Sequence, residues 1–206
     1  MESKEHWETV YTTKSSTEVS WFQEHAQLSL KLIRDAKIPS SASIIDVGGG
    51  ASKLVDDLLA SGYEYLTVLD LSAAAMAAAK ARLGNAAGRV NWLEANILSA
   101  ELPAGAYDVW HDRAVFHFLT TDDERQVYVN QVLHAVKPNG LVIVATFAED
   151  GPTKCSGLPV TRYSASELHA RFGKPFLLLG HEKETHHTPA GNEQKFVYCL
   201  FRKIAS

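Results

Sequence analysis

A glycine turn followed by an acidic residue is the pattern in this chain that most clearly predicts chemistry. The apolar run 43–47 leads into Gly48, Gly49 and Gly50, and the next apolar run ends in Asp70. Glycines let the main chain bend sharply and approach a ligand without obstruction by Cβ atoms, and the following helix offers free N–H groups. Asp70 can accept hydrogen bonds from two ribose hydroxyls. The pattern predicts a site for an adenosine-containing cofactor.

Three cofactor classes can be compared with this turn. A Walker phosphate loop needs a hydroxyl residue after its lysine, where this chain has Leu54. A dinucleotide loop prefers a third glycine, where this chain has Lys53, and there is no Tyr-x-x-x-Lys pair. S-adenosylmethionine has no phosphates, so the turn need only accommodate its amino-acid part while Asp70 holds the ribose. A plain strand-to-helix connection remains the structural alternative, which Asp70 makes less favoured.

The elements that would position these residues alternate along the chain. At 206 residues with 46% hydrophobic composition, residues 1–206 are expected to form a single domain. Expected strands are 44–47, 65–69, 90–93, 108–111, 141–147, 176–182 and 195–202, and expected helices are 21–36, 53–61, 72–83, 122–136 and 166–172. The turn 189–192 predicts a terminal hairpin. The fold class is therefore α/β, a Rossmann-like doubly wound sheet of seven strands, mostly parallel with an antiparallel C-terminal hairpin.

Composition limits the partners. Lys and Arg number 20 against 24 Asp and Glu, a net charge of −4 with no long run of either sign. This balance disfavours nucleic acid and a membrane surface as partners. The polar start and the short apolar runs predict no signal peptide and no transmembrane helix, so we expect a cytoplasmic protein. Cys155 and Cys199 are too few for a disulfide framework and are expected to remain thiols. Composition leaves the oligomeric state open.

The motifs together resemble the class I, seven-strand S-adenosylmethionine-dependent methyltransferases, in particular the methyltransferase-like subgroup, along essentially the whole chain. Residues 44–50 resemble the first motif of the family, residues 107–114 the fourth-strand motif, and residues 137–140 the turn before the fifth strand. The resemblance implies that S-adenosyl-L-methionine is bound and S-adenosyl-L-homocysteine is the product. It implies these cofactor-binding residues: Asp46, Gly48, Gly49, Gly50, Asp70, Leu71, Asn96 and Ile97. Asn96 departs from the family's usual aspartate, which changes the expected contact with the adenine amino group.

The N-terminal segment resembles a cap found in methyltransferase-like proteins, including lysine methyltransferases that act on an elongation factor. Residues 1–38 would then form a cap and a helix over the cofactor site. Tyr11 and Trp21 are equally suited to face the cofactor's sulfonium, a favourable cation–π arrangement, or to pack in the core. For Trp7 and Phe22, core packing is the favoured interpretation.

The end of the fourth strand carries the candidate catalytic residues Asp112, His111 and His117. Methyl transfer gains much from alignment and desolvation, so a base is optional. Strand alternation sends His111 and Asp112 to opposite faces, and Asp112 is preferred for contact with cofactor or acceptor. His117 is more typical of a core histidine. Arg113 could attract an acidic acceptor, although a salt bridge to Asp122 or Asp123 is the simpler interpretation.

The loop after the fifth strand is where this family places acceptor-binding elements. Phe147, Cys155 and Tyr163 are therefore candidates, with Arg113, for the substrate pocket. The adjacent pair His186 and His187 would point to opposite faces of a strand, and no third ligand is suitably spaced, so no metal is expected.

The acceptor remains open between three hypotheses. A small-molecule acceptor, with a thiol, amine or oxygen nucleophile, is favoured because the cap and loop could close over a compact molecule, and residues 111–116 also resemble thiol and thiopurine methyltransferases. A protein lysine methyltransferase is the alternative that the N-terminal resemblance suggests. The third is a catalytically inactive, S-adenosylmethionine-binding regulatory protein. Arg113-Ala114-Val115 stands where lysine methyltransferases tend to have a Lys-Gly-Thr-like sequence, which argues against the second.

Overall fold

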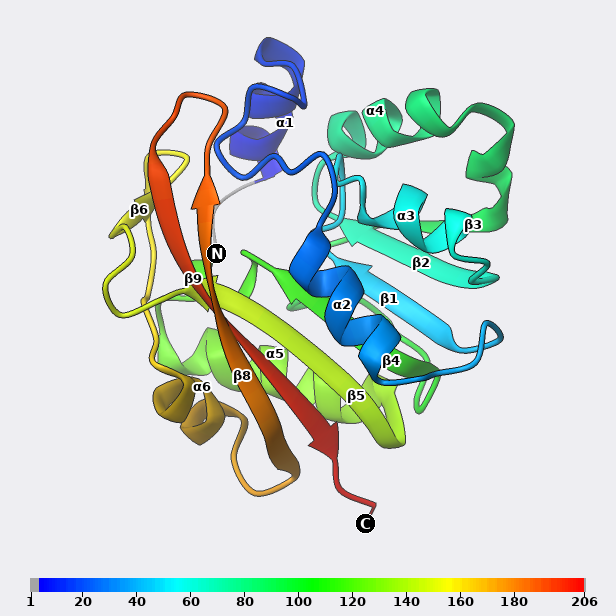
Figure 1. The fold of residues 1–206 in the computed structure, drawn as a ribbon, viewed down its shortest axis with the longest axis vertical. Coiled ribbons are helices and arrows are strands. Elements are labelled where there is room, and N and C mark those ends of the chain that lie inside the picture. Colours follow the sequence, from blue (N-terminus) through cyan, green and yellow to red (C-terminus); the bar gives the residue numbers. More distant parts are fainter. Residues whose placement is uncertain (1–3, 206) are drawn as a thin grey trace.

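The computed structural model describes residues 4–205, and within them seven strands form one mixed sheet (Figure 1). The strands are β1 (Ser43–Val47), β2 (Tyr65–Asp70), β3 (Val90–Glu94), β4 (Tyr107–Arg113), β5 (Val136–Phe147), β8 (Phe176–His187) and β9 (Glu193–Lys203). Their order is β3-β2-β1-β4-β5-β9-β8. Strands β1 to β5 are parallel, and β9 and β8 are antiparallel. The predicted fold class is confirmed, including the antiparallel terminal hairpin.

Helices cover both faces of the sheet. They are α1 (Lys4–Thr13), α2 (Gln27–Asp35), α3 (Leu54–Ala60), α4 (Ala73–Leu83), α5 (Asp122–Ala135) and α6 (Ala165–Phe172), with 3-10 turns η1 (Gly84–Arg89) and η2 (Phe116–Phe118) and a small hairpin of β6 (Lys154–Cys155) and β7 (Leu158–Pro159). In Figure 1, α2 lies in front of the sheet and α5 behind it. None of the helices in the described chain is long and apolar enough to cross a membrane.

Two apolar layers hold the sheet between these helices. Ile44 of β1 packs with the α2 and α3 side, and Ile45, the next residue, packs with the α5 and α6 side. Both are fully buried because a central parallel strand is covered on each face. Successive side chains of β1 therefore point to opposite faces of the sheet, and each face packs against its own helices up to the glycine loop.

Local signals set the helix ends where the sequence predicts them. Ser72 accepts a hydrogen bond from Ala75 N at 3.1 Å and caps α4, which ends at Gly84. Thr121 and Glu124 form a capping box at the start of α5. These ends matter for function because α3 and α4 both begin next to the carboxyl edge of the sheet.

The N-terminal helix prediction is wrong in its first turns. Helix α2 begins at Gln27, whereas periodicity predicts a start at Trp21, and a separate helix α1 precedes it. The backbone carbonyl of Ser20 accepts a hydrogen bond from His186 at 2.8 Å, and that of Trp21 accepts one from Arg113 at 3.2 Å. These tertiary contacts hold the segment in an irregular conformation and override its helical propensity.

Candidate functional site

The glycine loop leaves β1 in a conformation that side chains would obstruct. Gly48 has a φ of +72°, and an added Cβ there would collide with Val115. A Cβ on Gly50 would lie 2.5 Å from Asp70 Oδ2, and one on Gly49 would collide with the carboxylate of Asp46. All three glycines are therefore required by close approach of the backbone to its neighbours.

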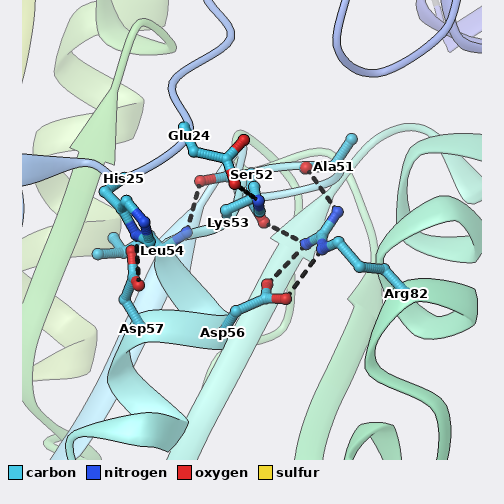
Figure 2. Close-up of polar contacts among 9 residues, drawn as sticks. All are labelled: Glu24, His25, Ala51, Ser52, Lys53, Leu54, Asp56, Asp57 and Arg82. Atoms are coloured by element: carbon cyan, nitrogen blue, oxygen red, sulfur yellow. Dashed lines mark hydrogen bonds and ion pairs between the residues drawn. The ribbon is translucent and has the colours of Figure 1, made fainter.

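Arg82 of α4 clamps the outer end of this loop (Figure 2). Its guanidinium donates to the carbonyl oxygens of Ala51 at 3.1 Å and Ser52 at 2.8 Å. The same group makes a bidentate ion pair with Asp56 of α3, at 2.9 and 2.7 Å. An ion pair between Lys53 and Glu24 adds a tie to the N-terminal segment. The loop is thus held from outside by α3 and α4, away from the side that faces the cavity.

Asp70 ends β2 next to the loop, as the sequence predicts. Its Oδ1 accepts a hydrogen bond from the backbone N–H of Ser72 at 2.8 Å. Burial raises the pKa of Asp70 from 3.8 to about 6, against the opposing effect of backbone N–H groups at Ser72, Gly50 and Leu71. The carboxylate is therefore ionised at neutral pH and able to accept hydrogen bonds from a ligand.

A cavity lies at the carboxyl ends of β1, β2, β3 and β4, where an open α/β sheet binds ligands. Its empty space is about 710 Å³, counted to its open mouth. Its wall consists of Trp7, Tyr11, Trp21, Val47, Gly48, Leu69, Asp70, Leu71, Ala95, Ile97, Arg113, Ala114, Val115, Phe118 and Cys155. The structure thus brings together most of the predicted cofactor residues and two of the predicted substrate residues, Arg113 and Cys155.

Four aromatic rings form the roof of this cavity. Trp7 meets Trp21 and Phe118 edge to face, with ring centroids 5.7 and 5.2 Å apart. Trp21 Nε1 donates a hydrogen bond to the hydroxyl of Tyr11 at 3.0 Å. The sequence favours core packing for Trp7. In the structure Trp7 packs against the hydrophobic core and also lines the cavity.

Helix α1 is fixed over the cavity by its charged residues. The carboxylate of Glu8 accepts hydrogen bonds from the backbone N–H groups of Ala73, at 2.5 Å, and Ala74, at 3.3 Å. These are the first residues of α4, so the negative charge of Glu8 also complements the positive end of that helix. Lys4 forms an ion pair with Glu94 at the end of β3. Of residues 1–38, Trp7, Tyr11 and Trp21 line the cavity, whereas α2 packs against the sheet, and residues 1–3 fall outside the described residues.

A second hollow adjoins the first around Asp46 and His111. His111 Nδ1 lies 2.7 Å from Asp46 Oδ1, and its Nε2 lies 2.8 Å from Ser29 Oγ of α2. Both ring nitrogens of His111 are thus engaged. Asp46 Oδ2 is buried and has no hydrogen-bond partner among residues 4–205. An unsatisfied buried carboxylate oxygen beside the glycine loop suits a ligand that brings a charged N–H donor.

Asp112 departs from the preferred interpretation of its role. It is fully buried, and its carboxylate accepts hydrogen bonds from Val115 N at 2.8 Å, Phe116 N at 3.1 Å and the hydroxyl of Tyr128 at 2.5 Å. Strand alternation turns its side chain away from both hollows, and His111 is the residue that faces one of them. Asp112 holds the turn after β4 in place.

Three other predicted site residues lie behind the cavity wall. His117, Phe147 and Tyr163 are at most 2% exposed. His117 Nδ1 accepts a hydrogen bond from Phe147 N at 3.3 Å, and burial lowers the pKa of His117 to about 3. The imidazole is neutral and packs between the rings of Phe118 and Phe147. These buried residues lie behind the residues of the cavity wall and support them.

Arg113 has a different partner from the one the sequence suggests. It pairs with Glu184 of β8 at 3.3 Å, while Asp122 pairs with Arg125 and Arg171. The sequence separation of 71 residues between Arg113 and Glu184 explains why local reasoning chose a nearby acid.

Some wall residues gave little signal in the sequence. Val115 and Phe118 follow β4, in a stretch whose apolar residues are typical of core packing. Ala95 and Ile97 face the cavity, whereas Asn96 between them turns its Oδ1 to Leu98 N at 2.9 Å. This hydrogen bond closes an Asx turn after β3, and the contact of Asn96 with adenine stays a prediction.

The structure is an α/β protein of the Rossmann-like type with a cavity at the carboxyl edge of its parallel strands. Residues 45–142 match a family model described as a methyltransferase domain. An uncharacterized methyltransferase of Mycobacterium bovis is 29% identical over 124 residues, which is 60% of this chain and 60% of the relative. The match therefore spans about three fifths of that relative's length.

Two further similarities extend the comparison. The eEF1A lysine and N-terminal methyltransferase of Mus musculus is 23% identical over 141 residues, 68% of this chain and 20% of the relative. A 1,6-didemethyltoxoflavin-N1-methyltransferase of Burkholderia thailandensis, solved with bound 1,6-didemethyltoxoflavin and S-adenosylhomocysteine, superposes with a TM-score of 0.68 at 18% identity, over 95% of this chain and 81% of that one. The family model and these similar proteins are all methyltransferases, and the chain is similar to S-adenosylmethionine-dependent methyltransferases in sequence over its central part and in fold.

Proposed function

We propose that this protein transfers a methyl group from S-adenosylmethionine to a small-molecule acceptor. The observation that carries the proposal is the cavity at the ends of β1 to β4, which combines a glycine loop, an ionised Asp70 and an aromatic roof. The loop and the carboxylate suit a nucleoside with an amino-acid tail. The roof of α1 leaves room for a compact acceptor and excludes water from the reacting groups.

Each part of the cofactor has a matching group in the wall. Asp70 would accept hydrogen bonds from the ribose hydroxyls, and Ile97 with Ala95 would pack on the adenine. The free Oδ2 of Asp46 fits the ammonium of the methionine part. His111 holds that carboxylate in position and is itself held by Ser29. The chemical types of these residues therefore suit the parts of the cofactor.

The cofactor supplies a methyl carbon already activated by a sulfonium. The chain's own residues align the reactants and keep out water. Trp7, Tyr11 and Trp21 offer aromatic faces on which a positive sulfonium is favourable. Asp112 and His117 are assigned to support of the wall, and His111 to orientation of Asp46, so the proposal needs no dedicated base.

A protein lysine methyltransferase is the second candidate, because the mouse relative carries that activity in its name. It requires a passage for a lysine side chain past α1. The roof of Trp7, Trp21 and Phe118 is packed edge to face, which favours the compact acceptor.

Calorimetry and labelled-methyl transfer test both candidates. S-adenosylhomocysteine should bind with one site per chain, and Asp70→Ala should weaken that binding strongly. Incubation of the protein with labelled S-adenosylmethionine and a cell extract, separated into small-molecule and protein fractions, should place label in small molecules. Label confined to protein would support the lysine alternative, and binding without any transfer would support a regulatory protein.

A further inference from the structure

Residues 20–23, which we call the strap, lie between α1 and α2 in the chain and form no helix or strand of their own. Side chains of the last hairpin hold the beginning of the strap. His186 Nε2 lies 2.8 Å from the carbonyl oxygen of Ser20, and Gln194 Nε2 donates a hydrogen bond to Ser20 Oγ at 3.3 Å. The sheet therefore fixes the strap through side-chain contacts.

Arg113 reaches the next residue of the strap from the end of β4. Its guanidinium donates hydrogen bonds to the carbonyl oxygen of Trp21 at 3.2 Å, to the hydroxyl of Tyr198 at 2.8 Å and to Glu184 at 3.3 Å. The guanidinium carbon also lies 4.2 Å from the ring centroid of Phe196, and the side chain of Arg113 is 8% exposed. A planar guanidinium donates in several fixed directions at once, so Arg113 holds the main chain of Trp21 relative to the sheet.

Glu184 of β8 belongs to the same network. Its Oε2 accepts hydrogen bonds from Arg113 and, at 3.1 Å, from the hydroxyl of Tyr198. Its Oε1 accepts a hydrogen bond at 3.1 Å from the side chain of Gln23, the last residue of the strap. The charge of Arg113 is therefore balanced by a carboxylate that also binds the strap, and an anionic ligand would have to compete with Glu184.

The side chain of Trp21 forms part of the wall of both hollows. It lines the main cavity and the second hollow, as do Tyr11, Gly48 and Arg113. Its Nε1 donates a hydrogen bond to the hydroxyl of Tyr11 at 3.0 Å, and its ring meets Trp7 edge to face. The ring and the carbonyl group of Trp21 are joined through the same Cα atom, so a shift of the main chain there would move the ring and reshape both hollows.

We propose, building on the methyl transfer inferred above, that Arg113 is a positioning residue, which holds the main chain of Trp21 so that the indole stays in the wall of the cavity. Arg113 then serves the alignment of the wall and does not bind an acidic acceptor. An aromatic face favours a sulfonium over a neutral thioether, so the position of Trp21 sets how strongly the cavity prefers the charged cofactor. Loss of the guanidinium should lower that preference.

A lysine at this position distinguishes positioning from charge. Arg113→Lys keeps the positive charge, whereas a single ammonium on a flexible stem cannot reproduce the planar guanidinium. If Arg113 acts by its charge alone, the lysine variant should behave like the native protein. If Arg113 acts by position, the lysine variant should behave like a protein in which Trp21 is displaced.

The position of Trp21 is measured first, without a ligand. The protein contains four tryptophans, so labelling with fluorotryptophan gives four fluorine NMR resonances, and Trp21→Leu identifies the one from Trp21. In Arg113→Lys this resonance should shift or broaden, whereas the resonances of Trp92 and Trp110 should keep their native positions. Changes spread over all four resonances would indicate a general loss of packing and would overturn the inference.

The preference for the sulfonium is measured next, as the Kd of S-adenosylhomocysteine divided by the Kd of S-adenosylmethionine, both from calorimetry. Trp21→Leu and Arg113→Lys should each lower this ratio about fivefold. The double variant should also lose only about fivefold, because both changes remove the same contact. Losses that multiply to about 25-fold would mean that Arg113 acts independently of Trp21, which overturns the inference.

Arg125→Lys is the matched control. Arg125 is a buried arginine of α5 that donates hydrogen bonds to the carbonyl oxygen of Leu119 at 2.8 Å and to Asp122 at 2.7 Å, and it lines neither hollow. This variant should leave the Trp21 resonance and the Kd ratio at their native values. An equal effect in Arg125→Lys would contradict a specific role of Arg113.

Tyr198→Phe keeps the inference testable if Arg113→Lys does not fold. This change removes one partner of the guanidinium and keeps the buried ring. It should displace the Trp21 resonance and lower the Kd ratio about twofold. An unmoved resonance with a native ratio in Tyr198→Phe would overturn the inference.

The outcomes separate this inference from the proposed function. If both cofactor forms bind and Arg113→Lys keeps the native resonance and the native ratio, the positioning role is overturned and the methyltransferase proposal stands. If neither form binds to the native protein, both proposals fall.

Discussion

At the scale of single residues, we expect Asp70 to make cofactor binding depend on pH. Its pKa in the folded protein is raised by burial to about 6, and ribose hydroxyls donate hydrogen bonds that only the carboxylate form can accept fully. As pH falls through 6, the protein must lose a proton to bind, so affinity weakens about tenfold per pH unit. Calorimetry with S-adenosylhomocysteine between pH 5 and 8 should show this slope.

Asp70→Asn is the matched control for that slope. Asparagine keeps one oxygen acceptor and has no titration in this range, so its binding should be weaker at pH 8 and flat with pH. A slope of equal size in the variant would assign the pH dependence to another group. The effect on folding has the opposite sign, because a raised pKa favours the folded protein below pH 3.8, and that contribution is lost as pH rises through 6.

We expect Asp112 to stabilise the folded protein and not to bind the cofactor. Asp112→Ala leaves the N–H groups of Val115 and Phe116 and the hydroxyl of Tyr128 without their buried acceptor. We expect a loss of about 3 kcal/mol in the free energy of unfolding, measured in urea. Where the variant still folds, its affinity for S-adenosylhomocysteine should stay within about threefold of the native value, a limit corresponding to less than about 1.4 kcal/mol. A folded Asp112→Ala protein with native stability and lost binding would contradict this assignment.

Residue types predicted that the glycine loop and Asp70 would meet at one cavity, but not that Trp7 and Phe118 would line it. Gly48 and Asp70 carry their chemistry in their type and follow strand ends, so spacing alone predicts their meeting. Trp7 and Phe118 are apolar residues whose role depends on which surface they cover. That surface exists only in the folded protein, so no local sequence pattern predicts it.

At the scale of elements, the clamp from α4 onto the glycine loop should control cofactor affinity. Arg82→Ala frees the carbonyl groups of Ala51 and Ser52 and breaks the pair with Asp56. A looser loop must be ordered on binding, so the Kd for S-adenosylhomocysteine should rise about tenfold, or about 1.4 kcal/mol. Calorimetry measures the change directly.

Lys80 on the same helix offers the comparison. It lies over the ring of Trp92 at 5.3 Å and makes no contact with the loop in the described structure. Lys80→Ala should therefore leave the Kd within about twofold of native, less than about 1.4 kcal/mol. Equal losses in both variants would mean that the effect comes from α4 stability and not from the clamp.

Helix α1 should open less often when the cofactor is bound. Its ties to the body, Glu8 to α4 and Lys4 to Glu94, lie at its ends or on exposed surface, while its rings face the cavity. Hydrogen exchange of residues 4–13 should slow at least about tenfold when S-adenosylhomocysteine binds. Glu8→Gln should reduce that protection, because its amide bonds the α4 N-terminus more weakly than a carboxylate does. Unchanged exchange in residues 4–13 would mean that the cap does not respond to the cofactor.

The helices show which boundaries the sequence alone could predict and which it could not. Capped helices such as α4 were predicted to within a residue because Ser72 and Gly84 are local signals. Helix α1 was missed because its segment is polar and short of buried residues, with Val10 as its one buried side chain. Its place is set by contacts with α4 and β3, more than 60 residues away in the chain.

At the scale of the whole molecule, the strand order explains why the mixed topology was predictable. A buried apolar run such as β5 predicts a parallel central strand, and the turn at residues 189–192 predicts the hairpin that follows. The reach of β8 and β9 could not be predicted. Both extend beyond the neighbouring strands and meet the segment around Ser20, through pairings that depend on three-dimensional packing.

That pairing of the first segment with the last hairpin has a consequence for synthesis on the ribosome. Ser20 forms hydrogen bonds with His186 and Gln194, which are synthesised 166 and 174 residues later. The parallel core can assemble while the chain is still emerging, but the roof of the cavity closes only when β9 is complete. We expect ribosome-stalled chains ending before residue 184 to bind no labelled S-adenosylhomocysteine, whereas chains with residue 205 outside the exit tunnel bind it. That result would mean that cofactor binding begins only after the sheet is complete.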